Sequence, residues 1–251
     1  MGLDVYVGSL TRYYTGDWLT IIQQTFPGKV QIVRPGAPKD AEGNAPSAGD
    51  VQHNVLQWQK SVSKALGRAV HWNESHEAPY FTNKPSWDRF GALMLWAAYT
   101  GLNIPRAERL ERITLDNWQS DGSLKTCANR GGEAPYPQLT LGIEIWLPLG
   151  NSTIFAAPDP TGHTRVFGSV EGLVEELHAL NAASWGADEA TRRQWLPRAT
   201  REHPDKPEEL FGPEAPPEGT PLEEAAKAGW SMMLDLAQQA IEHRLPVILD
   251  Y

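Results

Sequence analysis

Hydrophobic and polar residues alternate at the start of the chain. Residues 3–7 have the sequence Leu-Asp-Val-Tyr-Val, and a glycine follows them. A period of two is typical of a β-strand with one apolar face. The same reasoning predicts a strand over 139–147, in which leucine and isoleucine alternate with other residues. Shorter strands are predicted at 29–33, 153–156, 165–167 and 247–249. The three strands in the middle of the chain, at 139–147, 153–156 and 165–167, are expected to form an antiparallel meander.

Apolar residues at helical spacing predict the helices. A single apolar stripe indicates an amphipathic helix at each of 51–66, 170–180 and 222–241. Residues 87–99 are apolar around nearly the whole helix axis, which predicts a buried helix at the centre of the fold. Weaker patterns predict a helix within 18–26, with Thr15 as its N-cap, and another at 106–115.

Two stretches interrupt this pattern. Residues 34–49 are rich in Pro, Gly, Ala and Asp without an apolar period, which is typical of a loop. Residues 197–221 are rich in proline and acid, and we expect them to form a surface excursion. Strands at the start, middle and end, with helices between them, predict an α+β fold with a mixed, largely antiparallel sheet packed against several helices. We expect a single domain over 1–251, with one main core.

Composition is typical of a globular protein, because 41% of the 251 residues are hydrophobic and 21% are charged. The longest apolar runs are much shorter than a membrane span, and the first residues lack a basic segment. Cys127 is the only cysteine, so no internal disulfide can form. These features predict a cytoplasmic protein without a membrane partner.

The net charge narrows the choice of partners. A formal charge of −9 disfavours nonspecific binding to nucleic acid. A basic protein or a neutral small molecule fits this charge better. We therefore expect no nucleic acid partner, and we identify a basic protein as the candidate partner.

The densest group of potential catalytic side chains is His71, Glu74, His76 and Glu77, which all lie within seven residues. Such residues can bind a metal ion or transfer protons. Their spacing differs from the HExxH motif, and Pro79 limits the helix that would align them. A solvated polar loop that leads into the buried helix is the simpler interpretation. We predict no metal site and no cofactor.

A second group lies near the first strand. Asp4 and Tyr6 share the polar face of that strand, and Arg12, Tyr13 and Tyr14 follow in the adjoining segment. Together they offer hydrogen-bonding groups and aromatic rings, as binding clefts often do. A buried network that fixes the end of the strand is the structural alternative. These five residues are the candidate binding residues.

The motifs of serine hydrolases, P-loop proteins and dinucleotide-binding proteins are missing from the sequence. We therefore predict an acidic binding module without chemistry of its own, of the kind represented by immunity and antitoxin proteins. The alternative is a small-molecule hydrolase, metal-dependent or not, that uses the segment from His71 to Glu77.

Overall fold

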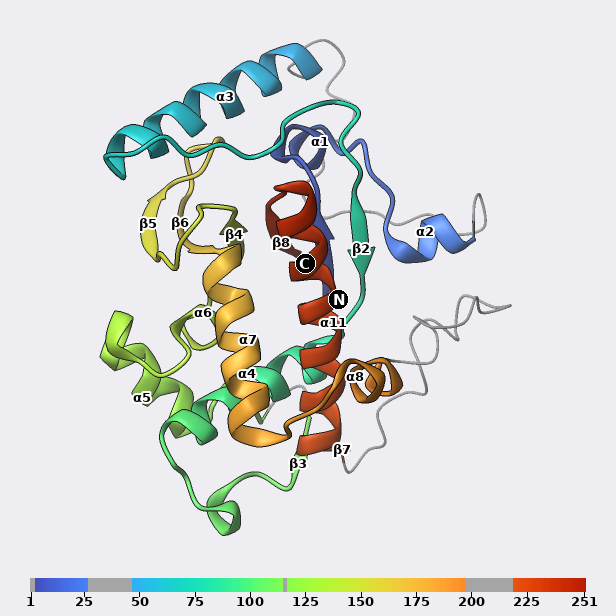
Figure 1. Cartoon of the computed structure of the whole chain (residues 1–251), viewed down its shortest axis with the longest axis vertical. Coiled ribbons are helices and arrows are strands. Elements are labelled where there is room, and N and C mark those ends of the chain that lie inside the picture. The colour runs from blue at the N-terminus through green and yellow to red at the C-terminus, as the bar shows by residue number, and fades with distance from the viewer. Residues whose placement is uncertain (1–2, 27–46, 115–116, 197–218) are drawn as a thin grey trace.

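A computed structural model describes residues 3–26, 47–114, 117–196 and 219–251 (Figure 1). Helices and a mixed sheet make up this structure, and the predicted α+β class is confirmed. Among the described residues, no helix combines the length and apolar character that crossing a membrane requires.

The central sheet has six strands in the order β2-β1-β8-β4-β6-β5. Their bounds are β1 Asp4–Val7, β2 Phe81–Asn83, β4 Ile145–Leu147, β5 Phe155–Pro158, β6 Thr164–Ser169 and β8 Val247–Asp250. Strands β4 and β6 run parallel, and the other neighbouring pairs are antiparallel. Two short strands, β3 (Arg112–Ile113) and β7 (Thr220–Pro221), pair separately. The first and last strands of the chain are therefore neighbours in the middle of the sheet.

Helices surround this sheet. They are α1 Leu10–Thr15, α2 Ile21–Thr25, α3 Ala48–Ala65, α4 Trp87–Gly101, α5 Gly122–Arg130, α6 Pro137–Thr140, α7 Val170–Ser184, α8 Glu189–Trp195 and α11 Leu222–His243. Two short 3₁₀ helices, η1 (Arg106–Glu108) and η2 (Gly131–Glu133), lie in the connections. The buried helix predicted at 87–99 is confirmed as α4, in which every residue from Phe90 to Tyr99 is buried.

Buried apolar residues gather on both faces of the sheet. The larger cluster, which is the main core, includes Val5, Val7 and Leu249 together with residues of α4, α7 and α11. The smaller cluster includes Tyr6 and Ile248 together with residues of α1 and α3. Figure 1 shows α3 crossing one end of the molecule, while α11 passes in front of the central strands and α7 runs down from the end of β6. Alternation along β1 therefore separates two packed faces, because each face is covered by helices.

Helices α4 and α11 make the most extensive helix contact of the structure. A Cβ atom added at Gly229 of α11 would lie 2.4 Å from the carbonyl oxygen of Arg89. The two backbones therefore approach at a distance that only glycine permits. This contact fixes the beginning of α4 against the main core.

The prediction for 18–26 is wrong in its boundaries. A first helix, α1, begins after Ser9, whose side chain accepts a hydrogen bond from the backbone N–H of Arg12. A second helix, α2, begins after Thr20 in a capping box with Gln23. The apolar spacing covers only the second helix. Ser9 and Thr20 are the caps, and Thr15 is the last residue of α1.

The predicted helix at 106–115 is also wrong. It consists of the short helix η1 followed by strand β3, which pairs with β7. Backbone pairing with a strand more than a hundred residues away overrides the weak local helix pattern. Helices α5 and α8 were not predicted, because their apolar stripes are too short to stand out.

The strand predicted over 139–147 is confirmed only in its last part, β4. Pro137 begins the short helix α6, and Gly142 adopts a φ of +65° that separates this helix from the strand. The predicted meander is wrong as well, because β4 pairs with β6 and β8 instead of β5. The antiparallel pairing of β5 with β6 does occur.

Most of the two predicted loops lies outside the described residues, since these omit 27–46 and 197–218. The strand predicted at 29–33 also lies outside the described residues. At the edges the structure corrects both boundaries. Ser47 caps α3, so 48–49 are helical, and Thr220–Pro221 form strand β7.

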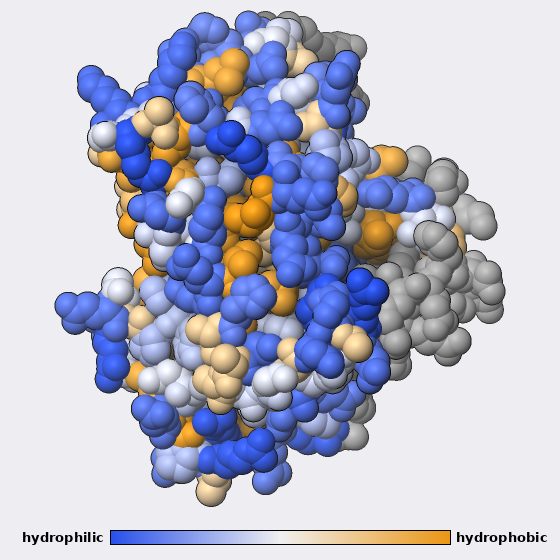
Figure 2. Space-filling model, in the orientation of Figure 1, coloured by the Kyte–Doolittle hydropathy of each residue, from blue (hydrophilic) through white to orange (hydrophobic). Residues whose placement is uncertain are grey.

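Surface polarity is uneven on the side that carries α7 and α11. Figure 2 shows a mostly polar face in which apolar residues are exposed at the centre and in smaller groups near the top and the left edge. Large hydrophobic residues that are exposed in the described part of the chain are Leu19, Leu56, Val166, Ile241 and Tyr251. Tyr251 has the largest exposed fraction of these, 57%, and it follows the last strand.

Candidate functional site

Charged residues meet at one end of the central sheet. Asp4 at the start of β1 is paired with Asp250 at the end of β8. The backbone N–H of Leu249 donates to the carbonyl oxygen of Glu144, so Glu144 lies at the same end of the sheet. Strand β6 begins there too, because it runs parallel to β4. Pairing of strands thus gathers residues that are far apart in the sequence.

Arg165 of β6 links two carboxylates at this end. Its Nε donates to Oδ2 of Asp159 at 2.8 Å, and its Nη1 donates to the carboxylate of Glu144. The other oxygen of Glu144 accepts a hydrogen bond from the hydroxyl of Tyr251. Four side chains from three parts of the chain are thereby held together.

Asp159 is the buried member of this network, with an exposed fraction of 3%. Burial opposes its ionisation, but hydrogen bonds from Thr161, Arg165 and the backbone of His163 lower its pKa below the usual value. The Asp-Pro and Thr-Gly pairs in this segment are typical of a turn. The backbone N–H groups of Thr161 and His163 donate to the Asp159 carboxylate, which agrees with that turn geometry. Asp159 therefore remains a carboxylate that orients Arg165.

Two tyrosines of α1 complete the site. The hydroxyl of Tyr13 donates to Oδ1 of Asp250 at 2.9 Å. The rings of Tyr13 and Tyr14 pack edge to face, with their centres 5.3 Å apart. Burial raises the pKa of both tyrosines, and the negative charge of Asp250 adds to the effect at Tyr13. Both hydroxyls therefore stay protonated and can donate hydrogen bonds.

We name this group the sheet-end cluster. It consists of Tyr13, Tyr14, Glu144, Asp159, Arg165, Asp250 and Tyr251. Three carboxylates and one guanidinium give it a formal charge of −2 (−3 + 1). All of its members except Asp159 are partly or fully exposed. The arrangement can hydrogen-bond a cationic group and place aromatic rings beside it.

Of the five candidate binding residues, only Tyr13 and Tyr14 belong to this cluster. Tyr6 is fully buried and its hydroxyl donates to the carbonyl oxygen of Ser9 at 3.1 Å. Asp4 is buried as well and forms an ion pair of 3.2 Å with Lys84.

Arg12 has a different set of contacts. Its guanidinium donates to the carbonyl oxygens of Ala78 and His76, both at 2.6 Å, and lies 5.0 Å from the ring centre of Tyr80. Asp4 and Arg12 thus attach residues 4–12 to the segment 76–84, and the ring of Tyr6 stacks on that of Tyr80 with the ring centres 6.2 Å apart. For these three residues the contacts correspond to the structural alternative, a buried network that fixes the end of the first strand.

The four candidate side chains between His71 and Glu77 do not converge on a common point. His71, His76 and Glu77 are exposed, whereas Glu74 is buried and points to the first turn of α1. Its carboxylate accepts hydrogen bonds from the backbone N–H groups of Leu10 and Thr11, and from the side chains of Thr11 and Trp72. Within the described ranges, no three His, Cys, Asp or Glu side chains come together as a potential metal-ion site.

Sequence reasoning missed Glu144, Asp250 and Tyr251 as site residues. Asp250 and Tyr251 follow directly after the predicted last strand, where polar residues often mark the end of a sheet. That signal was present in the sequence. Placing Glu144 beside them requires the pairing of β4 with β8, which no local pattern reveals.

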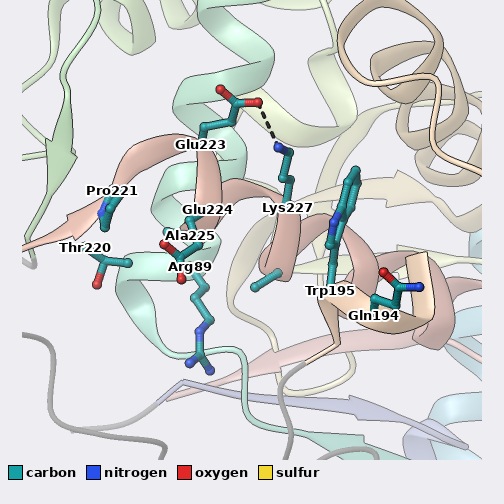
Figure 3. A pocket seen from close by; sticks show the side chains of 10 residues that line it. Arg89, Gln194, Trp195, Thr220, Pro221, Glu223, Glu224, Ala225 and Lys227 are labelled. Atoms are coloured by element: carbon teal, nitrogen blue, oxygen red, sulfur yellow. Dashed lines mark ion pairs between the residues drawn. The ribbon is translucent and has the colours of Figure 1, made fainter. Parts of the chain in front are cut away.

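A pocket of about 640 Å³ lies elsewhere, at the beginning of α11. Figure 3 shows Lys227 reaching toward Glu223, beside the ring of Trp195, while Arg89 extends away from this pair. Lys227 lies 2.9 Å from Glu223 and 5.1 Å from the ring centre of Trp195. The charged groups at its centre are therefore already paired with each other.

Comparisons of the chain with protein-family models, with curated proteins and with solved structures give no match.

Proposed function

We propose that this chain binds a basic partner protein and that the sheet-end cluster receives a lysine or arginine side chain of that partner. The observation that carries the proposal is the excess of carboxylates in the cluster. Arg165 is shared by Glu144 and Asp159, and Asp250 has a tyrosine hydroxyl as its hydrogen-bond donor. A further cation would therefore gain charge-assisted hydrogen bonds there.

The tyrosines support this proposal. Tyrosine is enriched at the energetic centres of protein interfaces, because its ring buries apolar area while its hydroxyl stays hydrogen-bonded. Tyr13 and Tyr251 donate hydrogen bonds to Asp250 and Glu144, and the ring of Tyr14 packs against that of Tyr13. A cationic side chain between them would interact with both the rings and the carboxylates.

The charge of the whole chain favours the same class of partner. A formal charge of −9 attracts a basic protein over distances of about a Debye length and speeds its association. A bacterial immunity or antitoxin role, with a basic toxin as the partner and the cytoplasm as the compartment, is the specific form of this proposal. We base no hydrolase proposal on the His71–Glu77 segment, because Glu74 is engaged at α1 and the other three side chains are exposed.

The test is affinity capture with two charge-matched variants. The cluster variant carries Glu144→Gln and Asp250→Asn, and the control carries Glu175→Gln and Glu242→Gln at exposed positions of α7 and α11. Each variant loses two negative charges. We expect the wild type and the control to retain the same basic protein at low salt, and the cluster variant to lose it. Equal retention by both variants contradicts the proposal, provided that their melting temperatures match.

A further inference from the structure

A second pocket lies where α4 and α7 end. Its volume is about 400 Å³, within the range of small-molecule pockets, and its lining includes Trp96, Thr100, Asn103, Arg106, Arg109 and Ser184. Two arginines therefore face one small cavity in a protein whose net charge is strongly negative. None of these residues belongs to the sheet-end cluster.

Arg109 is held in a fixed orientation. Its Nε donates to the carbonyl oxygen of Ile104 at 2.9 Å, and its guanidinium lies 5.2 Å from the ring centre of Trp96 and 5.8 Å from that of Tyr99. Within the described part of the chain, neither Nη group has a hydrogen-bond acceptor. The fork of N–H groups that binds phosphate in a bidentate manner is therefore oriented and available.

Arg106 supplies a second positive charge. Its side chain is 79% exposed and lies 3.3 Å from Glu223, a surface pair that contributes little energy in water. Burial, together with the charge of Arg106, lowers the pKa of Arg109. The two guanidinium groups therefore repel each other, and a bound anion would relieve this repulsion.

A neutral donor stands beside the arginines. The hydroxyl oxygen of Ser184 accepts a hydrogen bond of 2.9 Å from the indole N–H of Trp96. Its own hydrogen can point elsewhere, because a hydroxyl group donates and accepts at the same time. Ser184 can thus add a hydrogen bond to an anion in the pocket.

The arginines are not needed to cap the negative end of α4, as the hydrogen bonds there show. The carbonyl oxygens of Ala98, Tyr99 and Thr100 in its last turn accept from the backbone N–H groups of Leu102, Ile104 and Asn103. The helix end is therefore capped by its own backbone. Arg109 donates to a carbonyl oxygen beyond the helix, and its Nη groups remain for a ligand.

We propose that this pocket binds a phosphate monoester, with the phosphate group on the Nη atoms of Arg109 and beside Arg106. This site is additional to the proposed protein-binding function. Trp87, at the beginning of α4, contacts Tyr251 of the sheet-end cluster at 5.0 Å, whereas the pocket lies at the other end of α4. A helix of 15 residues separates them by about 22 Å, so each site can be tested alone.

The test is calorimetric titration with phenyl phosphate at pH 8 and constant ionic strength, repeated with inorganic phosphate and with benzoate. We expect wild-type protein to bind phenyl phosphate at one site and benzoate more weakly. Arg109→Gln should weaken binding at least tenfold, and Arg106→Gln severalfold. Arg130→Gln, an exposed arginine of α5, should leave binding unchanged.

Arg109→Lys separates orientation from charge, because lysine keeps the charge and lacks the fork. It should bind less tightly than wild type, and it provides a second test if Arg109→Gln does not fold. No binding by the wild type, or an equal loss in Arg130→Gln, overturns the site. Benzoate that binds as tightly as phenyl phosphate overturns its assignment to phosphate.

Discussion

The carboxylate of Glu74 accepts a hydrogen bond of 3.0 Å from the backbone N–H of Leu10, which lies 64 residues earlier in the chain. Thr11 adds two more hydrogen bonds, and the indole of Trp72 adds a fourth. Burial nevertheless raises the pKa of Glu74. A carboxylate at the first turn of a helix satisfies backbone donors that would otherwise lack acceptors. Glu74 therefore positions α1, and with it Tyr13 and Tyr14.

Glu74→Ala should destabilise the fold by about 3 kcal/mol, because it leaves buried donors without acceptors. Glu74→Gln should cost less, since an amide oxygen replaces part of the carboxylate. Urea unfolding of both variants measures these differences. An unchanged urea unfolding midpoint for Glu74→Ala would contradict the role of this carboxylate in stabilising α1.

Glu176 of α7 predicts a dependence of stability on pH. Burial raises its pKa to about 8, although the backbone N–H groups of Gln138 and Leu139 donate to its carboxylate. The folded state therefore binds a proton that the unfolded state loses near its ordinary pKa of 4.5. Stability from this group is present below that pH and is lost as the pH rises toward 8.

Glu176→Gln should remove this dependence, because glutamine does not ionise. We compare the free energies of unfolding of the two proteins from pH 4 to 9. That of the wild type should fall relative to that of the variant up to about pH 8, and the difference should then stay constant. Curves that run parallel over the whole range would contradict the raised pKa.

Gly229→Ala tests the close approach of α11 to α4. The added Cβ would meet the carbonyl oxygen of Arg89 at 2.4 Å, so one helix must shift. We expect a loss of about 1–3 kcal/mol, although alanine favours helix formation. Gly122→Ala in α5 is the matched control, because nothing lies within 4 Å of the added atom. Thermal melting should show a lower midpoint for the first variant only.

Several elements could be predicted from the sequence because their local signals agree with their tertiary contacts. Strand β1 alternates, β8 is apolar up to Asp250, and α11 has a long apolar stripe that packs on α4. The strand prediction for 139–147 was wrong in its first part, because the alternation of apolar residues continues through the short helix α6. A proline at the first position of α6 and the positive φ of Gly142 decide the local structure there.

The candidate site was predictable only in part. Tyr13 and Tyr14 stood out as neighbouring aromatic residues with an arginine before them. Glu144 and Arg165 gave no local signal, since their meeting depends on β4 and β6 running parallel. His71 and His76 stood out by density alone. Density along the chain did not bring these side chains together, because Glu74 is buried against α1 while His71, His76 and Glu77 are exposed.

Titration of isotope-labelled protein with a lysine decapeptide, followed by the backbone and side-chain NMR signals of each residue, tests whether the sheet-end cluster binds a basic partner. We expect the largest shifts at Tyr13, Asp250 and Tyr251, weaker shifts in the presence of salt, and none of these shifts in the Glu144→Gln, Asp250→Asn variant. The largest shifts at the acidic first turn of α11, or equal shifts in that variant, would contradict the assignment of the sheet-end cluster as the binding surface.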